Sequence, residues 1–469
     1  MSMTQTVICR ACGQSNSPGA AMCTGCWGLL DRVAAGIGEE VASTAERDLR
    51  KKEISRIRRS ILGSVLAAVG VVLAIQFLNV TLPVPPPSSD ISSVSGPGEW
   101  AMIYRTSEGA GPVPEESASI EGQVKWTFET SKPIVSTPTI KGGRLYLTTQ
   151  DNRVMALAAA TGSIIWEYGT ETAIDSSPTV AEGLVIFATR DRKVIALDAD
   201  TGQSRWQFVT GEGGPNTGSS LVKDGVVYVG SGDGKIYALD ALTGTERWSH
   251  LTRDWITNTA ALSGDILVVS SMDGRVTMYD TNTGKRRFSF RGLNQDVVGS
   301  PIIVEDSIYV PYRNGILATV NLKEEEVLFY SRWYRFKLQM WLWGWRDHPG
   351  LPKGVERTYR LRGTIEMTPA ADEGKVYVPI QDGRLHAIDR STGKRLWLFD
   401  SRAYGLSTPT IVEDTVLVGD GKGMLYAVDK DSGEKQWELQ IAERGFSTPV
   451  LAGGTLYLAS KDGTLYAVE

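Results

Sequence analysis

The residues best suited to chemistry are four cysteines near the N-terminus, in two Cys-x-x-Cys pairs: Cys9 with Cys12, and Cys23 with Cys26. Four thiolates at this spacing can close a tetrahedral zinc site with Zn–S bonds of about 2.3 Å. So short a segment buries almost no core, so the metal would supply most of its folding free energy, about 10–16 kcal/mol. The alternative is a redox-active or disulfide-bonded pair. A closed four-thiolate site has no open coordination position, so we expect structural zinc without catalysis.

The rest of the chain offers little enzyme chemistry. All 4 cysteines lie within the first 26 of 469 residues, which excludes thiolate catalysis and a disulfide framework from the remainder. The 3 histidines, His250, His348 and His386, are far apart, which argues against a histidine-rich metal site. The net charge of -5 argues against general nucleic-acid binding, so we expect no nucleic-acid partner for the main domain.

The N-terminal part of the chain predicts a small domain followed by a membrane anchor. Residues 1–30 resemble the zinc ribbons at the N-termini of many prokaryotic proteins, although Trp27 stands where such ribbons more often have glycine. Residues 31–60 form a basic juxtamembrane segment. Residues 61–82 are an apolar run long enough, as a helix, to cross a hydrocarbon core of about 30 Å.

Charge asymmetry orients this predicted transmembrane helix. Seven Lys and Arg side chains precede it within residues 47–59, and none follows it before Arg105. We therefore expect a single-pass protein of the cytoplasmic (inner) membrane, with its N-terminus in the cytoplasm and its C-terminal part exported. A cleaved signal peptide would have a far shorter N-terminal region. Residues 83–119, rich in Pro, Ser and Gly, are predicted to be an extended linker that holds the next domain off the bilayer.

A unit of about 40 residues repeats along residues 120–469. Most units contain an Asp-Gly hairpin turn, an apolar strand ending in Asp, a Thr-Gly turn, and an aromatic residue such as Trp206 four positions after that glycine. Four short strands in such a unit indicate one propeller blade. The segments that open the eight units begin at Ser136, Ser176, Gly218, Asn258, Gly299, Met367, Ser407 and Ser447.

The two ends of the repeat region predict ring closure. The last unit is one strand short of its tryptophan, and a spare strand over residues 124–128 precedes the first unit. Trp126 in this strand lies 40 residues before Trp166, in register with the repeat. We expect the spare strand to complete the last blade, because closure protects sheet edges.

The repeat pattern Ala-[Leu/Ile/Val]-Asp-x2-[Thr/Ser]-Gly-x3-Trp is similar to the tryptophan-docking repeats of pyrroloquinoline-quinone-like eight-bladed propellers. Four units match in full; Ala158 replaces the Asp in another, and Met278 and Phe288 replace the Ala and Trp in a sixth. The resemblance implies an all-β fold, an eight-bladed β-propeller in which each tryptophan packs between blades near the Thr-Gly turn. These tryptophans are therefore expected to be structural.

The resembled family contains both enzymes and scaffolds. Its quinoprotein dehydrogenases hold pyrroloquinoline quinone and Ca²⁺ on the axis, and many use a disulfide between adjacent cysteines with a catalytic Asp. This chain has no cysteine after Cys26, and we expect repeat aspartates such as Asp198 and Asp240 to accept hydrogen bonds within their own turns. We therefore expect neither pyrroloquinoline quinone nor enzymatic activity.

The non-catalytic members suggest the function. They resemble the periplasmic lipoprotein of the outer-membrane β-barrel assembly machinery, the BamB type, and serve as docking rings. We expect a protein-docking scaffold with envelope proteins as partners, in envelope or outer-membrane protein assembly. The alternatives are a quinoprotein-type dehydrogenase and a transmembrane sensor that couples the propeller to the zinc ribbon.

An aromatic and basic insertion, about residues 331–363, separates a degenerate fifth unit from the sixth. It carries eight basic and two acidic residues, a local charge of 8 − 2 = +6. Its aromatic spacing fits one face of a helix, which would stop in the Gly344–Gly350 region containing Pro349, and it also fits strand alternation. It can cover the fifth blade, dock a protein or contact the membrane surface. The candidate partner or membrane contacts are Trp333, Arg335, Trp341, Trp343, Trp345 and Arg346.

Overall fold

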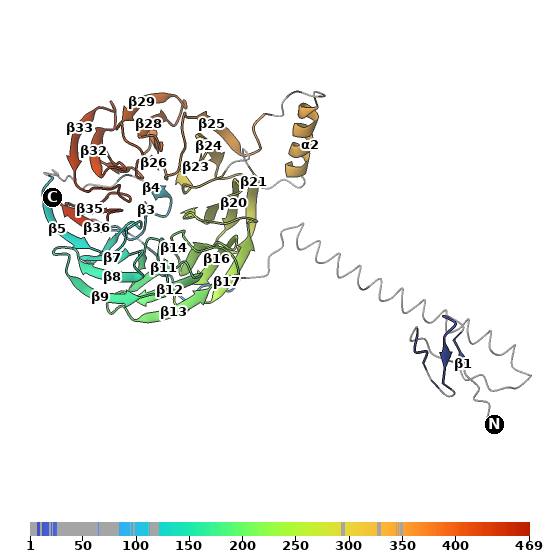
Figure 1. Cartoon of the computed structure of the whole chain (residues 1–469). Coiled ribbons are helices and arrows are strands. Elements are labelled where there is room, and N and C mark those ends of the chain that lie inside the picture. Colours follow the sequence, from blue (N-terminus) through green and yellow to red (C-terminus); the bar gives the residue numbers. More distant parts are fainter. Residues whose placement is uncertain are drawn as a thin grey trace, which may run out of the picture. The chain divides into compact units, whose positions relative to one another are not determined.

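A computed structural model describes the greater part of the chain, in two compact units, Met1–Val80 and Thr81–Glu469. The described residues are 7–9, 12–17, 20, 22–25, 64, 84–93, 95–96, 99–110, 112, 122–291, 296–325, 330–343, 345, 347 and 350–469. In the first unit, β1 (Val7–Ile8) and β2 (Ser15–Asn16) form an antiparallel pair. In the second unit, eight sheets surround a common axis, confirming the predicted eight-bladed propeller (Figure 1).

Seven blades are antiparallel sheets of four strands. The blades are numbered in chain order, and the four strands of each blade are given below from the axis outward. Blades 1 and 2 contain β6 (Thr139–Lys141), β7 (Arg144–Thr148), β8 (Arg153–Ala158), β9 (Ile164–Gly169), β10 (Thr179–Ala181), β11 (Leu184–Ala188), β12 (Lys193–Asp198) and β13 (Ser204–Val209). Blades 3 and 4 contain β14 (Leu221–Lys223), β15 (Val226–Gly230), β16 (Lys235–Asp240), β17 (Glu246–Leu251), β18 (Ala261–Ser263), β19 (Ile266–Ser270), β20 (Arg275–Asp280) and β21 (Arg286–Arg291). Blades 5 and 6 contain β22 (Ile302–Val304), β23 (Ser307–Tyr312), β24 (Ile316–Asn321), β25 (Val355–Arg360), β26 (Ala370–Ala371), β27 (Lys375–Pro379), β28 (Arg384–Asp389) and β29 (Arg395–Asp400). Blades 7 and 8 contain β30 (Thr410–Val412), β31 (Thr415–Gly419), β32 (Met424–Asp429), β33 (Lys435–Gln440), β34 (Val450–Ala452), β35 (Thr455–Ala459), β36 (Thr464–Val468) and β5 (Val124–Glu129).

The strand sequences follow from their positions in the blades. Inner and middle strands such as β11, Leu-Val-Ile-Phe-Ala, are buried on both faces by neighbouring blades. In outer strands such as β13 exposed and less exposed side chains alternate, and Trp206 is the only buried residue of that strand. Asp-Gly turns join the middle strands, and Gly234 has the positive φ of +80° that such turns require.

The tryptophans dock neighbouring blades as the sequence predicts. A Cβ on Gly244 would lie 2.6 Å from Trp206 of the preceding blade, so only glycine fits there. The Trp206 indole N–H also donates to the carbonyl of Ala241, at 2.9 Å. Seven junctions share this aromatic–glycine contact: Trp126/Gly162, Trp166/Gly202, Trp206/Gly244, Trp248/Gly284, Phe288/Gly354, Tyr359/Gly393 and Trp397/Gly433.

Ring closure is confirmed by strand pairing. β5 pairs antiparallel with β36, and Trp126 lies opposite Ala467. The eighth blade therefore takes three strands from the end of the repeat region and its outer strand from the beginning, as the sequence predicts.

The structure corrects the position of the insertion. β25 is the outer strand of blade 5 and pairs with β24, so the insertion lies inside blade 5 and residues 355–360 belong to the blade. Tyr359 takes the docking place of the missing tryptophan, against Gly393. The fifth unit looked degenerate because Gly354 and Tyr359 replace the Thr-Gly and Trp of the repeat pattern.

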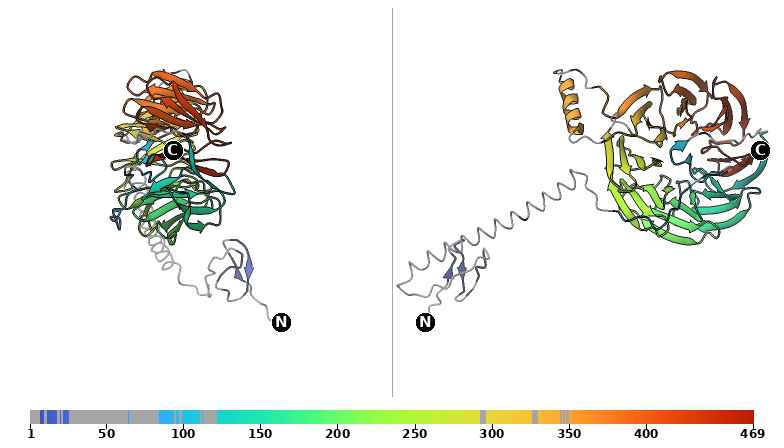
Figure 2. Two further views of the ribbon diagram at one scale, coloured as in Figure 1. Left: turned by 90° about the vertical axis from the view of Figure 1, so that its left-hand side faces the viewer. Right: turned by 180° about the vertical axis from the view of Figure 1, so that it is seen from behind.

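The predicted linker is also corrected. The described residues within 84–110 pack on the propeller, and their strands β3 (Arg105–Thr106) and β4 (Gly109–Ala110) lie at the centre of the ring (Figures 1 and 2). β4 extends the sheet of blade 6, with Ala110 parallel to Ala370. The segment was predicted to be a linker because it is rich in Pro and Ser, but its apolar residues Ile91, Trp100 and Met102 are buried in the core.

The insertion itself contains a helix, α2 (Tyr330–Leu342), outside the ring beside blade 5 (Figure 1). This confirms the helical alternative, and the helix ends at Leu342, before the expected Gly344–Gly350 region. Among the residues that the structure describes, no helix is both long and apolar enough to cross a membrane. The predicted transmembrane helix, residues 61–82, lies outside the described residues apart from Ser64.

Candidate functional site

Three of the four predicted zinc ligands come together. The sulfur atoms of Cys9, Cys12 and Cys23 all lie within 4.8 Å of one another, and those of Cys12 and Cys23 are 3.5 Å apart. Tetrahedral zinc with four thiolates places its sulfurs about 3.8 Å apart, so this donor set fits zinc. The fourth predicted ligand, Cys26, lies outside the described residues.

Backbone geometry positions this cysteine cluster. The β1–β2 pair brings Cys9 against the following turn, where Gly13 donates to the Cys9 carbonyl at 2.8 Å with a φ of +74°. The Gly25 N–H points at the Cys23 sulfur at 3.4 Å, and the Asn16 amide approaches the same sulfur at 3.6 Å. Such N–H donors stabilise thiolates, which is the form that binds metal.

The second candidate site is the axial channel, which residues 84–110, here called the plug, enter. The plug exchanges backbone hydrogen bonds with the inner strands of blades 1–5 and pairs with that of blade 6. Trp100 and Ile140 bond in both directions, at 2.7 and 2.8 Å. The other contacts are Ala101 with Val180, Ser93 with Val222, Ile91 with Gly225, Ser107 with Leu262, Glu108 with Ile303 and Ala110 with Ala370.

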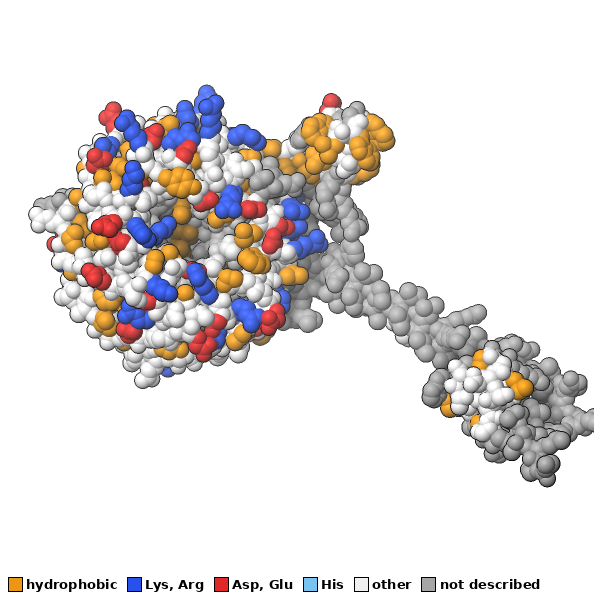
Figure 3. Space-filling model, in the orientation of Figure 1, with side chains coloured by type: hydrophobic (Ala, Val, Ile, Leu, Met, Phe, Trp, Pro, Cys, Tyr) orange, Lys and Arg blue, Asp and Glu red, His pale blue; other side chains and the backbone are white. Residues whose placement is uncertain are grey.

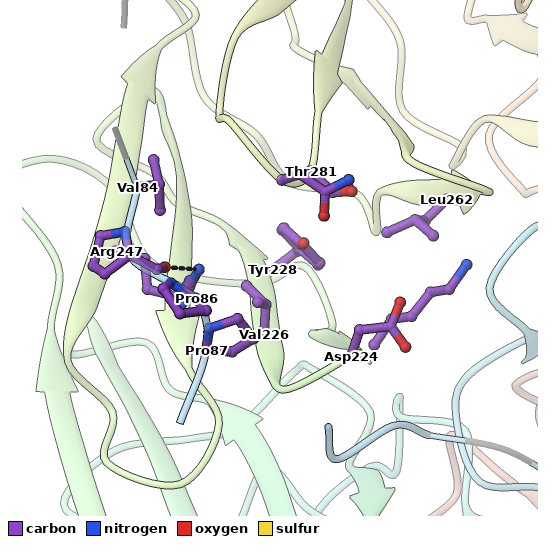
Figure 4. A pocket seen from close by; sticks show the side chains of 12 residues that line it. Val84, Pro86, Pro87, Asp224, Val226, Tyr228, Arg247, Leu262 and Thr281 are labelled. Atoms are coloured by element: carbon purple, nitrogen blue, oxygen red, sulfur yellow. Dashed lines mark hydrogen bonds between the residues drawn. The ribbon is translucent and has the colours of Figure 1, made fainter. Parts of the chain in front are cut away.

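Side chains of blade 3 secure the start of the plug. Asp240 accepts the N–H and the hydroxyl of Ser88, at 2.8 and 2.5 Å, and Arg247 donates to the Pro85 carbonyl at 2.5 Å. Burial by itself raises the pKa of Asp240, but the hydrogen bonds from Ser88 and Thr243 outweigh it and leave the pKa lowered. The proline run lines one side of a cavity of about 320 Å³ between blades 3 and 4 (Figure 4).

A ring of hydroxyl groups surrounds the axis beside the plug. Each blade begins with a segment that opens its repeat unit, and the second residue of that segment carries a hydroxyl group. The backbone N–H of this residue donates to the hydroxyl of the equivalent residue in the next blade. Five junctions have this bond: Thr137 to Ser177, Ser177 to Ser219, Ser219 to Thr259, Thr259 to Ser300 and Ser300 to Thr368. Sequence reasoning used these residues only to count units; their recurrence every 40 residues or so was the signal.

Tyr104 of the plug joins this hydroxyl ring. Its phenolic oxygen lies 3.2 Å from the Ser300 hydroxyl and 2.7 Å from that of Thr368. Burial raises the pKa of Tyr104 above its ordinary value, so the phenol stays protonated. Sequence reasoning missed Tyr104, although an aromatic residue in a supposed polar linker was a signal of burial.

The remaining axial cavity, about 180 Å³, does not fit the quinone and Ca²⁺ of the dehydrogenases. Pyrroloquinoline quinone is a tricarboxylate that needs cationic partners, and the described lining contains no Lys or Arg. Its two carboxylates, Asp175 and Glu366, are already hydrogen-bonded to Arg190 and Arg313. They are the only carboxylates among the described lining residues, whereas a Ca²⁺ site of six to eight oxygen ligands ordinarily includes several.

The repeat aspartates hold their own turns, as predicted. Asp198 accepts from the backbone N–H of Asp200 and from both the N–H and hydroxyl of Thr201. The Arg205 guanidinium, followed by these hydrogen bonds, lowers the pKa of Asp198 to about 2.

The third candidate site is the insertion. The predicted contacts Trp341, Trp343 and Trp345 are exposed, by 40%, 55% and 67%. They therefore do not cover blade 5, which its own strand β25 completes. Trp333 and Arg335 lie on α2, but the orientation of their side chains is outside what the structure describes, as is Arg346. Apolar side chains gather on α2 in the space-filling view (Figure 3).

Comparison with known proteins identifies relatives of the propeller. A family described as outer membrane protein assembly factor BamB matches residues 117–254, 251–334 and 339–469. No curated protein matched the chain. The structure of BamB from Moraxella catarrhalis is similar, with a TM-score of 0.59 and 20% identity, over 74% of this chain and 97% of that chain. A quinohemoprotein alcohol dehydrogenase from Pseudomonas putida HK5 is similar with a TM-score of 0.64 and 17% identity, over 81% and 83% of the two chains. At these identities, structural likeness shows the fold alone.

Proposed function

The chain belongs to the family of the outer membrane protein assembly factor BamB, and from that premise we propose that it is a non-enzymatic scaffold that docks other proteins of the cell envelope. One observation carries the proposal. The strands β3 and β4 of the plug lie at the centre of the ring, and the described lining of the remaining cavity of about 180 Å³ has no cationic side chain and only two carboxylates, both already hydrogen-bonded. Binding is then left to the outer surface of the ring.

The N-terminal unit gives this scaffold a second part. Cys9, Cys12, Cys23 and Cys26 would hold one structural zinc in the reducing cytoplasm, where thiols stay available for metal. Residues 61–82 would cross the cytoplasmic membrane once and leave the propeller outside the cytoplasm. The sensor alternative uses the same arrangement, with a cytoplasmic partner on the ribbon.

Two measurements on the full-length chain test the scaffold proposal. The first is a titration with pyrroloquinoline quinone and Ca²⁺, followed by tryptophan fluorescence. We expect no saturable change at tens of micromolar, and saturable Ca²⁺-dependent binding would replace the scaffold with a dehydrogenase.

The second measurement is photo-crosslinking in cells. A photoreactive residue replaces Tyr404, which is 65% exposed in the connection between β29 of blade 6 and β30 of blade 7. We expect a discrete adduct with an envelope protein, and the same substitution at the buried Tyr377 serves as the control. A Tyr404 profile identical to the control profile would count against a docking role for this face.

A further inference from the structure

The helix α2 and the turn after it expose large apolar side chains that the propeller does not cover. We call residues 330–351 the protrusion. Leu342 is 63% exposed, Trp343 55% and Trp345 67%. The docking tryptophans of the blades are buried by contrast, for example Trp206 at 8%. Phe336, Trp341 and Leu351 add further exposed apolar surface to the protrusion.

The exposed apolar side chains lie on more than one side of the protrusion. At 100° per residue, the exposed side chains of Trp341 and Leu342 lie about 140° and 240° from that of Phe336 around the axis of α2. The Trp343 and Trp345 rings meet edge to face, with centroids 5.2 Å apart. A groove on a protein partner receives one apolar stripe of a helix. The interfacial zone of a bilayer surrounds whatever enters it, so it suits this arrangement better.

The charge of the protrusion selects the type of membrane surface. The protrusion carries Arg332, Arg335, Lys337 and Arg346 against a single acid, Asp347. The first turn of α2 contains no acidic residue. The excess of 4 − 1 = +3 charges is complementary to anionic phospholipid headgroups. Tryptophan prefers this same depth of the bilayer, where its ring is apolar and its N–H is wet.

We propose that the protrusion binds the surface of a bilayer containing anionic phospholipid, with Leu342, Trp343 and Trp345 in the interfacial zone. The basic residues then lie at the level of the headgroups. This inference goes beyond the scaffold proposal and does not rest on it, because the propeller's docking surfaces take no part. Such contact fixes which side of blade 5 faces the membrane.

The test uses the full-length chain reconstituted into vesicles in which the phosphatidylcholine is brominated, with roughly 30 mol% phosphatidylglycerol. Bromine quenches only tryptophans that enter the bilayer. Trp343 and Trp345 are two of 13 tryptophans, so their quenching removes up to about 15% of the emission. Trp343→Ser/Trp345→Ser should abolish this component. Trp255→Ser is the matched control, because Trp255 is 46% exposed on the propeller between β17 and β18, and it should leave the component intact.

Each outcome decides the proposal. Quenching that disappears in the double variant and weakens without phosphatidylglycerol, or in 0.5 M salt, supports it. Equal quenching of the wild-type chain and the double variant overturns it. Quenching independent of anionic lipid also overturns it. An unquenched protrusion whose double variant loses a purified protein partner assigns the surface to protein docking instead.

Discussion

The aromatic–glycine junctions between blades allow the contribution of close packing to be separated from that of backbone strain. We consider Gly244→Ala, which places a methyl group 2.6 Å from the Trp206 ring at a residue with a φ of +70°. The positive φ costs a non-glycine residue about 1–2 kcal/mol. The contact must open by about 1 Å to reach ordinary separation, and overpacking of this kind costs about 1–3 kcal/mol. The free energy of unfolding should therefore fall by about 2–5 kcal/mol.

Gly264→Ala is the matched control. Gly264 also has a positive φ, +54°, but an added Cβ would have no heavy atom within 4 Å. Its substitution should cost only the backbone share, about 1–2 kcal/mol. The assay is urea unfolding of the full-length chain, followed by circular dichroism and by hydrogen exchange of blades 2 and 3.

A double-mutant cycle completes the argument. Trp206→Ala alone should cost about 3–5 kcal/mol, because it empties a buried aromatic site. In that background Gly244→Ala should cost only its backbone share, so the coupling free energy should be about 1–3 kcal/mol. Equal costs for the two glycine substitutions, or strict additivity in the cycle, would refute the steric account of docking.

Three further predictions concern the plug, a buried histidine and the cysteine cluster. Tyr104→Phe should lower the free energy of unfolding by about 1–2 kcal/mol, because the hydroxyls of Ser300 and Thr368 lose a buried partner, and limited proteolysis should then cut within residues 84–110 first. His386 is 2% exposed and neither ring nitrogen has a partner among the described residues; burial lowers its pKa to about 4. Because the unfolded chain takes up this proton first, stability should fall by up to about 3 kcal/mol as the pH drops from about 6.5 to 4, and His386→Gln should flatten that part of a urea-midpoint profile. Cys23→Ser should reduce bound zinc from about one per chain to near zero after chelator dialysis, measured by atomic emission, whereas Ser15→Ala should retain it.

The sequence predicts the structural features that depend on particular side chains. The Trp, Gly and Asp of the repeat pattern each perform one structural task at most blades, so their spacing indicates blade number, docking and closure. The cysteine pairs behave in the same way, because the structure brings Cys9, Cys12 and Cys23 together.

The plug was missed because most of its contacts with the inner strands are made by backbone groups. Bonds such as that from Val180 N–H to the Ala101 carbonyl involve groups that every residue has, so they leave no mark in composition. Blade 5 was misread for another reason. Gly354 packs against Phe288, and the Tyr359 ring packs against Gly393. Both aromatic–glycine contacts are therefore kept, although the residues differ from the repeat pattern.

The pairing of β5 with β36 has a consequence for synthesis. Glu129 and Thr464 lie opposite each other, 464 − 129 = 335 residues apart in the chain. At about 5–20 residues per second, the ribosome delivers the second strand roughly 20–70 s after the first. During that interval β5 presents an unpaired edge, and the ring cannot close however well its other blades have formed. Local strands form far faster than this interval. The nascent chain therefore needs its β5 edge to be protected until β36 has been synthesised.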